Sequence, residues 1–159
     1  MNSLAELQSR TAQPGLITWI GLRPERRAPM RPVTHARVGP AGLEGDHRAR
    51  PGVRALSLIQ AEHLPVIAAL AARNRVDYWQ LRRNLGVSGI NLAALKGRRL
   101  QIGAAVVRLT ERCSPCSRME AELGHGGYTA MRGHGGMLAE VLEPGDITIG
   151  DRVTLLEDR

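Results

Sequence analysis

The hydrophobic residues of this chain lie in short segments separated by glycine-containing turns. Gly15–Leu22, Ala104–Thr110 and Met137–Leu142 have the length of β-strands, and none approaches the length of a membrane span. Gly145-Asp146 and Gly150-Asp151 are turn signals near the end of the chain. Short strands joined by such turns favour a sandwich or barrel over a doubly wound sheet. We therefore predict a mainly β fold.

A few short α-helices are expected between the strands. Leu64, Ile67, Ala68 and Ala71 have helical spacing. Asp77 can cap a following short helix, and a glycine at position 124 can end another. The helices are predicted over residues 60–75, 78–82, 116–123 and 128–132.

The chain has 159 residues, of which 43% are hydrophobic, so one domain with a substantial core is expected. We predict a single domain over residues 1–159 with its core at about 16–156. Phenylalanine is absent, and the core must therefore be aliphatic.

The formal net charge is +7, and Lys96 is the one lysine among 22 basic residues. Arginine suits phosphate because its guanidinium group is a rigid, bidentate donor. The arginines are scattered, and aromatic residues make up 3% of the chain, which leaves no stacking platform for bases. A small anionic ligand is therefore expected, and nucleic acid is not.

The chain is expected to be cytoplasmic. Met1–Arg10 is polar and lacks the apolar region of a signal peptide. Two cysteines do not make a disulfide framework, so both thiols are expected to be reduced. No membrane association is expected.

Cys113-Ser114-Pro115-Cys116 is the segment that most directly suggests chemistry. It is compatible with a redox pair, with half of a zinc site completed by His125 and His134, or with one thiolate ligand to a heavier metal. It is also compatible with two small buried side chains. Spacing alone leaves all four interpretations open.

Two polar loops are further candidates. Gly45-Asp46-His47-Arg48 offers a close backbone approach, a carboxylate, an imidazole and a guanidinium group. Arg82-Arg83-Asn84 can hold a phosphate and the polar edge of a heterocycle, or it can be a solvated helix end. The glycine-rich segments near His125 and His134 lack phosphate-loop and Rossmann spacing.

Several of these segments occur in a characteristic order, and together they resemble the MOSC domain. That domain is the C-terminal part of molybdenum cofactor sulfurases and a module of the mitochondrial amidoxime-reducing component. The similarity covers about residues 16–156. The segments that carry it are Gly42–His47, Leu81–Leu92, Leu95–Gly103, Cys113–Glu120, Gly135-Gly136 and Gly145–Val153.

The resemblance implies a closed, mainly β barrel with short inserted helices and a bound molybdenum cofactor (molybdopterin). It implies that Cys116 ligates molybdenum. The expected cofactor-binding residues are Arg82, Asn84, Arg48, Asp46 and Arg83, and the expected catalytic residues are Cys116, His47 and Cys113. Pyridoxal phosphate occurs in family descriptions because sulfurases carry a separate desulfurase domain. It is not expected here, because Lys96 is the only candidate for a Schiff base.

Three functions follow as hypotheses. The first is reduction of N-hydroxylated compounds at a Cys116-ligated molybdenum, which requires an electron-donor partner. The second is a sulfur carrier with a persulfide on Cys116, resolved by Cys113 and supplied by a cysteine desulfurase. The third is a non-enzymatic module that binds zinc or nucleic acid.

Overall fold

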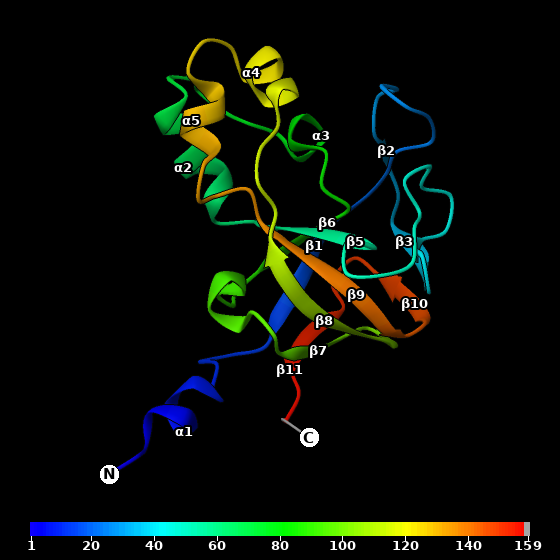
Figure 1. Cartoon of the computed structure of the whole chain (residues 1–159), viewed down its shortest axis with the longest axis vertical. Coiled ribbons are helices and arrows are strands. Elements are labelled where there is room, and N and C mark those ends of the chain that lie inside the picture. Colours follow the sequence, from blue (N-terminus) through cyan, green and yellow to red (C-terminus); the bar gives the residue numbers. More distant parts are fainter. Residues whose placement is uncertain (158–159) are drawn as a thin grey trace.

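A closed β-barrel forms the centre of the computed structural model, which describes residues 1–157 (Figure 1). Its seven strands follow the order β11-β7-β8-β9-β5-β6-β1, and β1 pairs with β11 to close the barrel. This confirms the predicted fold class. Residues 158 and 159 of the predicted domain lie outside the described residues. The strands are β1 (Gly15–Leu22), β5 (Leu56–Gln60), β6 (Leu85–Ser88), β7 (Arg99–Ile102), β8 (Ala105–Arg112), β9 (Met137–Glu143) and β11 (Arg152–Leu155).

A smaller antiparallel sheet packs against the barrel, and its order is β10-β3-β4. Val38, Leu43 and Ile147 from this sheet are buried in the same aliphatic core as the barrel strands. The remaining strand, β2, pairs with the end of β1. These strands are β2 (Arg31–Pro32), β3 (His35–Gly39), β4 (Gly42–Leu43) and β10 (Gly145–Thr148).

Four short helices gather at one end of the barrel and form a helical layer (Figure 1). They are α2 (His63–Leu70), α3 (Tyr78–Leu81), α4 (Ser117–Leu123) and α5 (Gly127–Met131). Ile67, Leu81, Met119, Leu123 and Met131 form a second core between them. All of β5 is buried because Leu56 and Leu58 belong to the barrel core while Ile59 belongs to this second core.

Local sequence signals located the helix ends correctly in two cases. Asp77 caps α3, and α4 begins after Cys116 and ends at Gly124, as predicted. The helix expected over 60–75 is shorter because Gln60 is the last residue of β5. Outside the helical layer, α1 (Leu4–Gln8) is capped by Ser3, and a 3₁₀ helix, η1 (Leu92–Leu95), follows β6. In the stretch from 1 to 157, no helix has the length and apolar character needed to cross a membrane.

Candidate functional site

The candidate site lies where the barrel meets the helical layer. The segment Cys113–Cys116 leads from β8 into α4, and Arg132–Gly136 leads from α5 into β9. The backbone N–H of Cys113 donates to the carbonyl of Gly136 at 2.9 Å, which holds the two segments side by side. A Cβ atom at Gly135 would overlap the carbonyl oxygen of Cys113. The cysteine segment therefore requires a glycine at this position opposite it.

Arg83 ties a third connection, from α3 to β6, to these two segments. Its Nε donates to the carbonyl of Gly135 at 2.8 Å, Nη1 to Leu81 at 3.0 Å, and Nη2 to Ser114 at 3.5 Å. The residue is only 8% exposed. A guanidinium group cannot lose its proton in a protein, so a positive charge is fixed beneath the cysteine segment.

Arg83 has no carboxylate partner among the salt bridges of the described residues. Burial is the main cause that lowers the pKa of Arg83, and the positive charges of Arg23 and Arg48 also lower it. The neighbouring Cys113 and Cys116 act in the opposite direction and raise it. Because the neighbouring carbonyls supply dipoles rather than full negative charge, an anion bound nearby would compensate this guanidinium group.

A group of arginines surrounds this position. We define the arginine cluster as the adjacent Arg82 and Arg83 together with the arginines whose charges lower the pKa of one or both of them, namely Arg23, Arg48 and Arg118. Burial lowers the pKa of Arg82, and Arg118, Arg23 and Arg48 lower it further, while Asp46 raises it. Arg82 has left-handed backbone geometry at the end of α3, and its Nη1 donates to the carbonyl of Ala28 at 2.7 Å. Such a concentration of positive charge favours an anionic ligand.

Asp46, a predicted cofactor-binding residue, is bound to Arg23. Its Oδ1 accepts from the backbone N–H and the Nε of Arg23 at 2.7 and 3.0 Å, and its Oδ2 accepts from Nη2 at 2.7 Å. Burial raises the pKa of Asp46, but the hydrogen bonds and charge of Arg23 outweigh that effect and hold the pKa below its ordinary value. Asp46 therefore orients Arg23 and stays ionised at neutral pH.

Asn84, also a predicted cofactor-binding residue, is fully buried. Its Oδ1 accepts from Ser57 Oγ at 3.1 Å and from Arg23 Nη2 at 3.2 Å, and its Nδ2 donates to Gly21 at 3.2 Å. Its amide thus contacts protein groups and braces β1, β5 and β6 behind the arginine cluster. A direct contact with cofactor stays a prediction.

His47 and Arg48 are both exposed on the loop before β5. The Nδ1 atom of His47 lies 2.8 Å from the carbonyl oxygen of Arg23. A carbonyl only accepts hydrogen bonds, so Nδ1 carries a proton, and in the neutral ring Nε2 is left as a free acceptor. Arg48 lies close enough to lower the pKa values of Arg82 and Arg83. The sequence-predicted loop is thus brought to the arginine cluster.

The two cysteines differ in accessibility. Cys116 is exposed and caps α4 without a side-chain hydrogen bond, whereas Cys113 is half-buried, and both are free. Within residues 1–157, no three His, Cys, Asp or Glu side chains are grouped to hold a metal ion. The ligand set of a structural zinc site, which needs four protein groups, is therefore not formed by Cys113, Cys116, His125 and His134.

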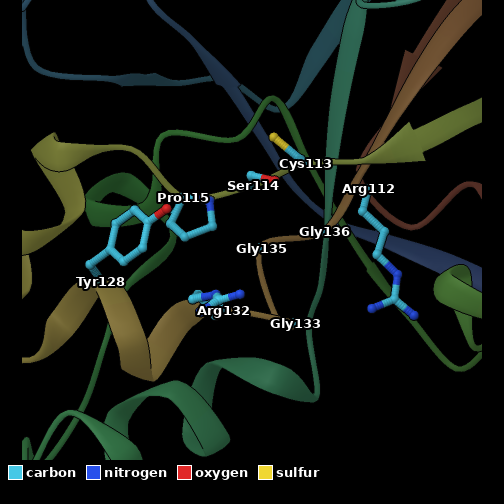
Figure 2. A pocket seen from close by; sticks show the side chains of 9 residues that line it. All are labelled: Arg112, Cys113, Ser114, Pro115, Tyr128, Arg132, Gly133, Gly135 and Gly136. Atoms are coloured by element: carbon cyan, nitrogen blue, oxygen red, sulfur yellow. The ribbon is translucent and has the colours of Figure 1, made fainter.

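A cavity of about 260 Å³ opens beside Cys113, Ser114 and Pro115 (Figure 2). The side chains of Arg112, Tyr128 and Arg132 line it, and Gly133, Gly135 and Gly136 form a backbone wall. Figure 2 shows Tyr128 and Pro115 together at one end of the cavity, with Arg132 below the cysteine segment.

Several residues at this site were not among those predicted from the sequence. Arg118 was within reach of prediction, because it lies two residues after Cys116 in the segment that carries the resemblance. Arg23 had no local signal, because it reaches the site through contacts with the distant Asp46 and Asn84. Arg112 and Arg132 directly precede Cys113 and the glycine-rich segment Gly133–Gly136, so their sequence positions could have indicated them. Tyr128 was assigned only to a helix.

The structure thus combines a closed β-barrel with an exposed thiol beside concentrated positive charge. The MOSC domain profile matches residues 42–154, and the chain belongs to the MOSC domain family. A comparison with curated protein sequences gave no match.

Solved structures show the same fold. The YuaD protein from Bacillus subtilis superposes with a TM-score of 0.81 at 17% identity, covering 92% of this chain and 98% of that one. YiiM from Geobacillus stearothermophilus gives 0.75 at 20% identity, covering 91% and 76%. YiiM from Escherichia coli gives 0.73 at 19% identity, covering 92% and 71%.

Proposed function

We propose that this protein binds the molybdenum cofactor and uses it to reduce N-hydroxylated compounds. The family is associated with this cofactor. The observation that carries the proposal is the position of the exposed Cys116 thiol next to an arginine cluster that contains a buried guanidinium group without a carboxylate partner.

The residues present fit such a group. Cys116 offers a soft sulfur donor with no competing side-chain hydrogen bond in the cap of α4. Arg82, Arg48 and Arg118 carry charge suited to a terminal phosphate. Asp46 and Asn84 would support that surface by orienting Arg23.

The reaction combines one N-hydroxyl group with two electrons and two protons and yields the corresponding N–H compound and water. The bound cofactor would supply the two-electron chemistry, and a separate electron-donor protein would supply the electrons. The Nε2 atom of His47 makes no hydrogen bond among the described residues, so His47 in its imidazolium form, with a proton on each ring nitrogen, is the proposed proton donor to the departing oxygen. We expect this activity in the cytoplasm.

Metal and pterin analysis of protein from a molybdate-fed host tests this function. We expect molybdenum and pterin in equal amounts in the wild type. Cys116→Ala should lose molybdenum, whereas the matched variant Cys113→Ala should retain it. Wild-type protein that contains neither molybdenum nor pterin would contradict the proposal.

A sulfur-carrier function is the second candidate, favoured by the pairing of an exposed cysteine with a half-buried one three residues before it. The Cys113 thiol would attack the Cys116 persulfide, form a disulfide between the two residues and release hydrogen sulfide. A cysteine desulfurase would supply the sulfur. Sulfane sulfur on Cys116 in protein without molybdenum would favour this function over the first.

A further inference from the structure

The cavity beside the cysteine segment is not lined by the residues proposed above to hold the cofactor. Its lining includes Arg112, Tyr128 and Arg132 but neither Cys116 nor Arg82. Cys113 contributes to the wall between them, and its backbone is fixed to Gly136. The cavity is therefore bounded by the first three residues of the cysteine segment and not by the proposed molybdenum ligand itself.

The charge around this cavity is positive and uncompensated. Its lining contains no aspartate or glutamate. Across residues 1–157, the guanidinium groups of Arg112 and Arg132 take part in none of the side-chain hydrogen bonds or salt bridges found. Arg83 adds a third positive charge from behind, because it donates to the carbonyls of Gly135 and Ser114, two lining residues.

Glu120, whose carboxylate contacts the backbone of the lining residue Tyr128, is engaged by backbone donors and not by the arginines. The Glu120 carboxylate accepts from the backbone N–H groups of Gly126 and Tyr128, both at 3.0 Å. These bonds fix the start of α5, the helix that brings Tyr128 and Arg132 to the cavity. The positive charge of the arginines is thus left for a ligand.

The size and lining of the cavity suit a small compound. One wall consists of glycine backbone, and Tyr128 and Pro115 offer apolar surface at the other end (Figure 2). The volume of about 260 Å³ is near the lower end for ligand pockets. Guanidinium groups bind phosphate and carboxylate through paired hydrogen bonds.

We infer that this cavity binds the phosphate or carboxylate group of the substrate, with Arg112 and Arg132 as its ligands. The anion site follows from the cavity itself, and its assignment to an N-hydroxylated substrate rests on the proposed function. An oxyanion in this cavity has two possible sources, the substrate and the terminal phosphate of the cofactor, and the experiment separates them.

The first part of the test is a titration of cofactor-free protein with phenyl phosphate, followed by the NMR signals of the Gly133, Gly135 and Gly136 amides. We expect saturable shifts with phenyl phosphate and none with phenol. Arg112→Gln and Arg132→Gln should each weaken binding about tenfold, the loss of a charge-assisted hydrogen bond. Both side chains are exposed, so melting temperatures should stay near that of the wild type.

Arg152→Gln, on β11, is the matched control, because it removes an exposed arginine that does not line the cavity. It should bind phenyl phosphate like the wild type. Equal affinity of the wild type and Arg132→Gln for phenyl phosphate would overturn the assignment of the anion site. Amide shifts with phenol as large as those with phenyl phosphate would also overturn it.

The second part uses cofactor-loaded protein. A phosphorylated N-hydroxylated substrate should have a lower KM than its unphosphorylated form, and Arg132→Gln should remove that difference. Loss of phenyl phosphate binding upon cofactor loading would assign the cavity to the cofactor and overturn the substrate assignment. Failure of the protein to bind molybdenum would remove the proposed function, while binding of phenyl phosphate would still establish the anion site.

Discussion

Replacement of Asp46 by asparagine would remove the carboxylate that holds Arg23 in place. Three N–H groups of Arg23 donate to Asp46, and the two side chains are only 11% and 2% exposed. The amide nitrogen of an asparagine would face these donors, and the charge of Arg23 would remain buried without a counter-ion. Loss of one partner of such a pair costs about 3–5 kcal/mol.

The measurement is thermal and urea denaturation of Asp46→Asn at neutral pH. For a domain of this size, the expected loss corresponds to a decrease in Tm of about 6–20 °C. Asp146→Asn is the control, because its ion pair with Arg37 is exposed and should contribute about 1 kcal/mol or less. Similar small losses in both variants would refute the assignment of Asp46 as a structural anchor of the arginine cluster.

The same pair predicts an acid limb of stability. The folded-state pKa of Asp46 lies below its ordinary value of 3.8. Its contribution is therefore complete above about pH 3.8 and is lost as the pH falls through the lower, folded-state value. Asp46→Asn should therefore show a smaller fall of Tm below about pH 3.8 than the wild type. An equal fall in both proteins would contradict the link between the pKa of Asp46 and stability.

Two further predictions concern the connection before β9 and His63 of α2, whose ring centroid lies 5.0 Å from that of His134 in this connection. Gly135→Ala should lower Tm by several degrees, because the added Cβ would overlap the Cys113 carbonyl, whereas Gly39→Ala, which meets only ordinary contacts, should have little effect. Burial, and then the nearby charge of His134, lower the pKa of His63 from its ordinary value of 6.5. As the pH falls, His63 therefore takes up a proton in the unfolded state before it does so in the folded state, and stability should decline below about pH 6.5. His63→Gln should weaken that decline in a profile of Tm against pH.

Local signals in the sequence sufficed where a feature depends on neighbouring residues. The cap at Asp77 follows from side-chain capping, and the end of α4 at Gly124 follows from a positive φ that glycine adopts readily. Barrel closure is different, because it depends on pairing of β1 with β11, near opposite ends of the chain. It was predicted through the resemblance rather than from strand patterns.

The candidate site shows the same difference between features set by neighbouring residues and features set by distant contacts. Arg82 and Arg83 are adjacent in sequence, yet only Arg83 is buried, where its guanidinium group donates to carbonyls of Leu81, Ser114 and Gly135. The partners of Arg83 at Ser114 and Gly135 lie 31 and 52 residues away. No local pattern identifies such contacts, so the sequence indicated the correct loop but not the role of each side chain.

The central claim is that the Cys116 thiolate ligates molybdenum, and X-ray absorption at the molybdenum edge tests it directly. Wild-type protein and Cys113→Ser should show one sulfur ligand beyond those of the pterin. Cys116→Ser should lose that sulfur and gain an oxygen or nitrogen scatterer. An unchanged sulfur count in Cys116→Ser would contradict the claim.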